Sequence, residues 1–471
     1  MDNVDSSSRL PNHPNSCGDY SSLVRHVITS EDRVLSLLLR KRCSFSTKQG
    51  ILQGERRKER MENIGYSSKK IIGIVIALSL TIMLLSSAVV VLPHTAAAKP
   101  GSLPTLNSKL CKSFGGTWTP GKTPTCTITT SPYDSSQNFS ISAKTTFVIA
   151  SGASFYTATN VSIINYGTID LKPGSTAQGT MDTILQSFGV LTNYGKINVE
   201  NPLTEFRLNY GTFTNYGAVN NSGAFDNELN STAINYGTVT NNYFSNSVFR
   251  NYGTFTNTAT GTINSSTIFS NYGTFSNVGT IYSAYDFYNA AGTFYNSGTI
   301  YSSDFFTNSG AFSNSGTLYS TNRFNNFGTF SNAGTINTTS TFVNNNGKAI
   351  SNSGTIFIGA SSFVQNYGSV TNNASGTIAN KGFIENDGTF ANNGTFYNYN
   401  SISNIAGYNF INAATLSNNG TFSNSGTLTN TGTFDDTSGS VTNIGTITNS
   451  GTWIPTPDLN CTDYLSGVGC P

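Results

Sequence analysis

The chain alternates apolar and polar residues in six-residue units between about Ile141 and Trp453. In the stretch NYGTFSNVGTIYS, at 271–283, an aromatic or aliphatic residue heads each unit, Asn follows two positions later, and Gly two positions after the Asn. The T-F-S-N part alternates with a period of two, which predicts a half-buried β-strand. The pair that ends in Gly predicts a corner, because Gly adopts backbone conformations that a β-carbon forbids to other residues.

Three such units form a larger repeat of 18 or 19 residues, and self-similarity near this length is typical of a solenoid. A meander of hairpins is the alternative. It is disfavoured because the residue before Gly is often Tyr, Val, Phe or Ile, which resist the positive φ of two-residue hairpin loops. Gly in second place suits a type II bend, after which the chain continues forward. We therefore predict an all-β fold, a right-handed parallel β-helix over 141–454 with 18–20 residues per coil. It would have on the order of 16 coils and a length of roughly 75 Å at the usual strand spacing.

Stacked coils would place each residue on its counterpart in the next coil, about 4.8 Å away. The predicted core column contains Phe275, Phe294, Phe312 and Phe330. The predicted Asn ladder contains Asn277, Asn296, Asn314 and Asn332, with each amide bonding the next as in cross-β stacks. A buried Asn without that partner would cost roughly 1–3 kcal/mol, which explains why the residue recurs at this place.

The segment before the repeats predicts export. Two Lys residues precede an apolar run at 71–92, and Ala96–Ala98 follow it, as in a secretory signal. The run is also long enough to span a bilayer. We expect 71–98 to be a cleaved signal peptide or a retained N-terminal transmembrane anchor, a hydrophobic helix outside the solenoid. Residues 1–70 carry 13 Lys and Arg against 8 Asp and Glu, and form either a basic cytoplasmic tail or an extension before a true start at Met61.

Four cysteines follow this segment, in two groups at opposite ends of the predicted rod. Disulfide-bonded Cα atoms lie within about 7 Å of each other, so local pairs are expected. The predicted pairs are Cys111 with Cys126 and Cys461 with Cys470. They would staple an N-terminal cap at 99–140 and close a C-terminal tail at 455–471. Metal binding by these cysteines is disfavoured, because all three His residues precede Lys99.

Charge is sparse, at 10% of all residues, and no basic patch follows the N-terminal segment, so nucleic-acid binding is not expected. Parallel β-helices also include polysaccharide lyases and hydrolases, whose sites need clustered carboxylates. Here the acidic residues, such as Asp286, Asp304 and Asp387, are interpreted as scattered and solvated. The adjacent pair Asp435–Asp436 would point to opposite faces of a strand. We expect no catalytic, cofactor or metal site, with a carbohydrate-active enzyme as the alternative.

Three surface features predict binding of a ligand or covalent modification. Outward Thr pairs such as Thr212 and Thr214 are similar to ice-binding rows, which makes ice binding a minor alternative. Exposed tyrosines at corners could stack on sugars or a partner, or simply cover the groove between coils. The glycosylation candidates are Asn138 and Asn460, because both are predicted to lie outside the rod.

The N-x-G-T-[FIL]-x-N repeats between Asn165 and Thr452 resemble those of large secreted adhesins and filamentous-haemagglutinin-like surface proteins. The resemblance implies a right-handed parallel β-helix and a role at the cell surface. We therefore expect a non-catalytic, secreted or surface-tethered spacer, adhesin or matrix component. Its expected partners are cell-surface glycans or matrix proteins, with lateral or end-to-end self-association, and membrane contact only through the N-terminal hydrophobic segment.

Overall fold

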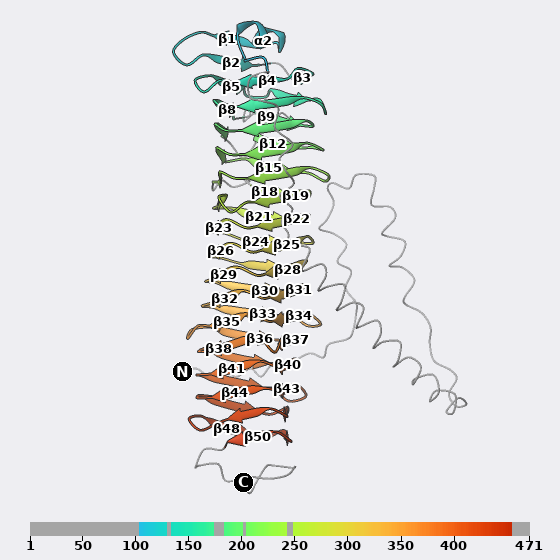
Figure 1. Cartoon of the computed structure of the whole chain (residues 1–471), viewed down its shortest axis with the longest axis vertical. Coiled ribbons are helices and arrows are strands. Elements are labelled where there is room, and N and C mark those ends of the chain that lie inside the picture. The colour runs from blue at the N-terminus through green and yellow to red at the C-terminus, as the bar shows by residue number, and fades with distance from the viewer. Residues whose placement is uncertain (1–102, 130–132, 174–182, 201–203, 243–247, 455–471) are drawn as a thin grey trace, which may run out of the picture. The chain divides into compact units, whose positions relative to one another are not determined.

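The computed structural model describes residues 103–129, 133–173, 183–200, 204–242 and 248–454. In this part of the chain the strands form three sheets of 18, 16 and 16 strands. Successive coils, each with one strand in every sheet, stack along one axis (Figure 1). We call the 18-stranded sheet B and the two 16-stranded sheets A and C. Each coil crosses sheet A first, then sheet B and then sheet C. The predicted parallel β-solenoid is confirmed. The tail 1–70, the hydrophobic segment 71–98 and the C-terminal tail 455–471 lie outside the described residues.

Two neighbouring coils show the repeating arrangement. The first contains β22 (Thr274–Asn277) in sheet A, β23 (Thr280–Ser283) in sheet B and β24 (Phe287–Asn289) in sheet C. The second contains, in the same order, β25 (Thr293–Asn296), β26 (Thr299–Ser302) and β27 (Phe306–Asn308). In the four-residue strands the apolar head at the second position and the residue at the fourth position are buried. The residues at the first and third positions face outward. The strand period seen in the sequence is thus the alternation between core and surface.

The predicted aromatic column is confirmed in the core of sheet A. Phe275, Phe294, Phe312 and Phe330 are in register on successive strands and at most 2% exposed. Neighbouring ring centroids lie 4.8–5.1 Å apart, and the rings are nearly parallel. This spacing is that of neighbouring strands, so the rings stack because the backbones do.

Coil length varies more than the repeat predicts. Phe294 and Phe312 are counterparts 18 residues apart, whereas Ile163 and Leu191 are counterparts 28 residues apart. The register of the strands is unaffected, because the extra residues lie between strands. Right-handed winding remains our prediction, in agreement with the usual hand of parallel crossovers.

Two of the three corners contain continuous asparagine ladders. The ladder at the end of sheet A runs through every coil from Asn165 to Asn449, and includes the four residues predicted from the repeat. The ladder at the end of sheet C runs from Asn227 to Asn443. In both, each amide nitrogen donates to the side-chain oxygen of the next coil, which satisfies buried polar groups that would otherwise be costly.

The corner after sheet B has an interrupted ladder. Asn221 donates to Asn241, and Asn380, Asn398 and Asn418 continue the pattern farther along. Between these two runs the equivalent residues are Ser265, Ser283, Ser302, Ser320, Thr338 and Ile358. Several of these hydroxyls bond locally instead, as Ser283 does to the carbonyl oxygen of Tyr285.

The corner glycines have a different role from the predicted one. The described glycines with positive φ are Gly115, Gly152, Gly347 and Gly407, so a type II bend does not explain the corners of the repeats. A β-carbon on Gly298 would instead overlap the carbonyl oxygen of Gly279 in the coil before. At Gly298, Gly fits because this corner lies too close to the coil before it for a β-carbon.

The N-terminal end of the core is covered by α2 (Ser108–Ser113) and β1 (Thr117–Thr119). Phe114 is fully buried there, with its ring centroid 5.1 Å from that of Phe139. The predicted disulfide between Cys111 and Cys126 is confirmed, with the two Cα atoms 5.7 Å apart. Parallel pairing already begins at β2 (Thr125–Ile128), inside the segment 99–140 that the sequence assigns to the cap. Cys461 and Cys470 lie outside the described residues.

The core is less fully packed where aliphatic residues replace phenylalanine. Ile350 and Val370 stand between Phe330 and Phe390 in the column of sheet A. The smaller side chains leave a cavity of about 20 Å³, lined by Phe342, Ile350, Ile356, Ile358, Val364, Val370, Ile378, Ile384 and Phe390. A cavity of this size that is lined only by apolar side chains is expected to stay dry.

Candidate functional site

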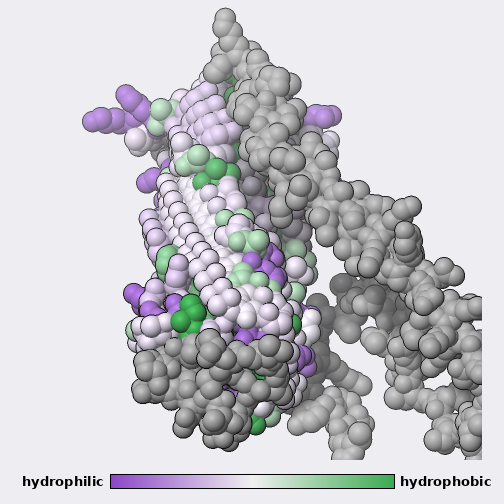
Figure 2. All heavy atoms as spheres, turned by 60° about the horizontal axis from the view of Figure 1, so that its bottom comes forward, coloured by the Kyte–Doolittle hydropathy of each residue, from purple (hydrophilic) through white to green (hydrophobic). Residues whose placement is uncertain are grey.

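The outer surface of the solenoid is mostly uncharged. In the space-filling view, much of the coloured surface has intermediate hydropathy, and strongly hydrophilic and hydrophobic residues are scattered (Figure 2). On sheet B, no strand from β17 (Thr238–Asn241) to β44 (Thr415–Asn418) carries a charged residue. The described surface therefore offers two kinds of candidate site: rows of exposed tyrosines and a few local clusters of charge.

Some of the surface tyrosines form columns along the rod. At the corner between sheets A and B, Tyr166, Tyr194, Tyr216 and Tyr236 stack with ring centroids 4.7–5.1 Å apart. On the outer face of sheet B, Tyr282, Tyr301 and Tyr319 stack at 4.9 Å. Interplanar angles of 3–10° mean that neighbouring rings within a column lie face to face.

This stacking changes what the tyrosines can bind. The sequence suggests that a sugar could stack on a tyrosine face, but within a column those faces contact each other. What reaches the solvent is a row of ring edges and phenol hydroxyls. Hydrogen bonding to the hydroxyls is therefore the chemistry that these columns offer.

The Thr pairs form only short rows. Thr212 and Thr214 on β13 (Thr212–Asn215) are followed in the next coil by Thr232 and Ile234. An uninterrupted Thr column occurs instead on sheet B, from Thr238 to Thr452, at the first outward position of every strand. The residue at the second outward position, two places after the Thr, differs from strand to strand.

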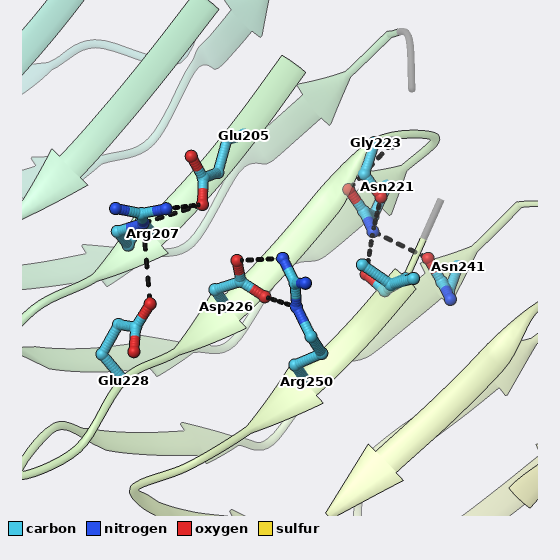
Figure 3. Close-up of polar contacts among 9 residues, drawn as sticks. Glu205, Arg207, Asn221, Gly223, Asp226, Glu228, Asn241 and Arg250 are labelled. Carbon is cyan, nitrogen blue, oxygen red and sulfur yellow. Dashed lines mark hydrogen bonds and ion pairs between the residues drawn. The ribbon is translucent and has the colours of Figure 1, made fainter. Parts of the chain in front are cut away.

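A cluster of five charged residues lies on the outer face of sheet C (Figure 3). Arg207, Asp226 and Arg250 are in register on β12 (Thr204–Leu208), β15 (Ala224–Asn227) and β18 (Val248–Asn251). Arg250 binds Asp226 through two hydrogen bonds of 2.6 Å. Arg207 lies 2.6 Å from Glu205 and 3.7 Å from Glu228. Each carboxylate in the cluster thus has a guanidinium partner.

Two of these carboxylates are shielded from water. Asp226 is 1% exposed and Glu205 is 8% exposed, although both lie on the outer side of the sheet. Burial raises the pKa of Glu205 to about 7; a hydrogen bond with Asp226 adds to the rise and the charge of Arg207 opposes it. Burial also raises the pKa of Glu228, and repulsion from Asp226 contributes. Glu205 can therefore exchange a proton near neutral pH, next to an ion pair that keeps Asp226 in place.

The expectation that acidic residues are scattered is wrong for this region. The signal that could have revealed the cluster is the shared place of three charges directly after a buried phenylalanine, in EFRL, AFDN and VFRN. Unequal coil lengths hid it, since Asp226 and Arg250 are 24 residues apart. A smaller charged cluster also joins two neighbouring coils: Lys172 lies 2.6 Å from Glu200 in the next coil and 3.6 Å from Asp170 in its own.

The pair Asp435–Asp436 is not simply solvated. Asp435 lies on the surface, but Asp436 is fully buried and accepts a 2.6 Å hydrogen bond from Asn418, in the place of a ladder asparagine. Its second carboxylate oxygen has no hydrogen-bond partner among the described residues. Burial raises the pKa of Asp436 to about 6, although the bond from Asn418 opposes the rise.

Asn138, a glycosylation candidate, is exposed but belongs to the first coil. Its side-chain oxygen accepts a 2.7 Å hydrogen bond from the backbone nitrogen of Ser162, so the prediction that it lies outside the rod is wrong. Asn460 is outside the described residues. Within the described ranges, no three His, Cys, Asp or Glu side chains are arranged to hold a metal ion. The described part of the chain also contains no helix with the length and apolar character needed to cross a bilayer.

Comparison with known proteins found no matching family model, curated protein or solved structure.

Proposed function

We propose that this chain is an exported, non-catalytic rod that acts as a spacer or adhesive element at the cell surface or in the extracellular matrix. The observation that carries the proposal is the uninterrupted asparagine ladder from Asn165 to Asn449. A ladder of this kind keeps the coils from Asn165 to Asn449 in register, and each coil depends mainly on its neighbours. Such a molecule is suited to spanning a distance and to presenting a repeated surface.

Export is supported by the sequence at 71–98, and an adhesive role by the rows of exposed tyrosine and threonine hydroxyls. Tyrosine is common at binding surfaces because it combines a large ring with a polar group. The low surface charge favours partners that are recognised through hydrogen bonds and shape.

Two measurements test this proposal. Protease treatment of intact cells that express the full chain should remove the solenoid while a cytoplasmic marker stays intact, unless the protein is found in the medium. Mass spectrometry of the mature N-terminus should give Lys99 if the segment is cleaved, or an earlier residue if it is an anchor. A solenoid that stays inside the cell, protected from protease, would refute the proposed role.

A carbohydrate-active enzyme is the second candidate, and the cluster around Glu205 is the observation that favours it. A carboxylic acid with a pKa near 7 beside a second carboxyl group is an arrangement that glycosidases use. The test compares the wild type with Glu205→Gln for release of reducing ends from a panel of polysaccharides. Activity that Glu205→Gln abolishes would establish the enzyme; equal or absent release in both proteins would leave the structural role.

A further inference from the structure

A patch on sheet B combines two regular columns of hydroxyl groups. It consists of Thr280 and Tyr282 on β23, Thr299 and Tyr301 on β26, and Thr317 and Tyr319 on β29 (Thr317–Ser320). We call it the Thr–Tyr patch. The identical residues are in register over three successive coils, so the patch is a small lattice rather than a chance grouping.

The spacing of the lattice is set by the backbone. Along each strand the threonine and the tyrosine are two residues apart, about 6.6 Å at the usual rise of a strand. Between coils the tyrosine rings repeat at 4.9 Å. The tyrosines are 36–47% exposed, whereas the threonines are half-buried, so the rings stand above the threonine column as a step.

The phenol hydroxyls of the patch are available to a ligand. None of the three takes part in a hydrogen bond recorded among the residues that the structure describes, and their rings are fixed by mutual stacking. A hydroxyl both donates and accepts hydrogen bonds. Side chains that are already ordered lose little entropy when a ligand binds, which favours binding to a repeating surface of this kind.

The lack of charge on sheet B limits the class of ligand that the Thr–Tyr patch can bind. The outer face of sheet B carries no charged residue from β17 to β44, so nothing on that face would neutralise a sulfate, uronate or phosphate. Polyanions are bound chiefly through Lys and Arg. A partner with many hydroxyl groups and no charge matches both the neutrality and the hydrogen-bonding capacity of the patch.

We propose that the Thr–Tyr patch binds an uncharged, extended polysaccharide that lies along the threonine column, against the step formed by the tyrosines. A regular polymer presents the same hydroxyl groups at each unit, so it can repeat one set of contacts from coil to coil. The inference deepens the proposed adhesive role and rests on export of the chain, because extracellular glycans are the partners that an exported rod meets.

The test is co-sedimentation of the purified full chain with insoluble neutral polysaccharides: cellulose, chitin and a β-1,3-glucan. Pectate and immobilised heparin serve as acidic counterparts. The expected result is retention on a neutral polymer that does not fall as salt is raised. The double variant Tyr301→Ala, Tyr319→Ala should weaken retention about tenfold or more, equivalent to at least about 1.4 kcal/mol.

Two further variants separate binding from folding. Tyr301→Phe with Thr299→Val removes only hydroxyl groups and should also weaken retention, with an unchanged thermal unfolding profile. The matched control Phe363→Ala, Phe383→Ala removes two stacked rings without hydroxyl groups from the outward side of sheet C and should bind like the wild type.

Three outcomes would overturn the proposal: no retention on any neutral polymer, retention that both double-alanine variants share equally, or salt-sensitive retention on acidic polymers alone. Analytical ultracentrifugation tests whether a second copy of the chain covers the patch instead. A wild-type dimer that Tyr301→Ala, Tyr319→Ala dissociates, without glycan binding, would mean that a second copy covers the patch. These failures differ from a failure of the proposed function, which would appear as protection of the solenoid from protease in intact cells.

Discussion

The side-chain nitrogen of Asn296 lies 2.7 Å from the side-chain oxygen of Asn314, one coil farther along the chain. Asn314 donates in turn to Asn332 at 2.8 Å and to the carbonyl oxygen of Thr335 at 3.2 Å. Asn314 is fully buried and its two ladder neighbours are 1% exposed. Each ladder residue therefore satisfies polar groups in the coils on both sides of it.

Replacing Asn314 by Leu should destabilise the solenoid more than an ordinary substitution does. The side-chain nitrogen of Asn296 and the side-chain oxygen of Asn332 would each lose a partner, at about 1–3 kcal/mol for each buried group. Thermal unfolding followed by circular dichroism should show a lower midpoint. The control is Asn337→Leu on the outward side of β32 (Thr335–Thr338), expected to change stability by about 0.5 kcal/mol or less. Equal effects of the two substitutions would contradict the importance of the ladder.

Gly298→Ala should destabilise the corner between β25 and β26. The added methyl group would overlap the carbonyl oxygen of Gly279, which belongs to the backbone of the neighbouring coil and cannot move alone. We expect a loss of about 1–3 kcal/mol, as for overpacked sites, measured by thermal unfolding. Gly121→Ala is the control, since a β-carbon there has no neighbour within 4 Å. An unchanged midpoint for Gly298→Ala would show that the corners can separate without cost.

Asp436→Asn should stabilise the protein at pH 7 and remove a pH dependence. The folded protein raises the pKa of Asp436 from 3.8 to about 6, so folding favours its protonated form. Its contribution to stability is therefore greatest below about pH 4 and is lost as pH rises to about 6, by on the order of 2 kcal/mol. An asparagine carries no charge and can still accept the bond from Asn418. Unfolding midpoints of the two proteins, measured from pH 4 to pH 8, should agree in acid and diverge towards neutral pH; parallel curves would contradict this account.

Val370→Ile should stabilise the core by up to about 0.5 kcal/mol, because it fills some of the 20 Å³ cavity and empty space costs about 24 cal/mol per Å³. Val219→Ile, at a fully buried site that does not line this cavity, should instead destabilise by overpacking. Chemical denaturation of both variants measures the difference. A loss of stability in Val370→Ile would mean that the cavity cannot accept a methyl group.

The columns were predictable from the sequence because they depend on a local period. Phe275 and Asn277 occupy fixed places in a strand, and the strand repeats with the same pattern of burial. The reason for Gly298 was not predictable in the same way, since the crowding arises between coils rather than within a turn. The charged cluster was missed for a related reason: pairing of Asp226 with Arg250 depends on a coil length that the six-residue period does not fix.

The asparagine ladders give the rod a direction. Every ladder amide between Asn165 and Asn449 donates towards the C-terminal end, so the ladder starts at an acceptor, the side-chain oxygen of Asn165, and ends at a donor, the side-chain nitrogen of Asn449. Two rods that met with like ends would oppose acceptor to acceptor or donor to donor. Any filament that continued these ladders would consequently have all its subunits pointing the same way, with two unlike tips.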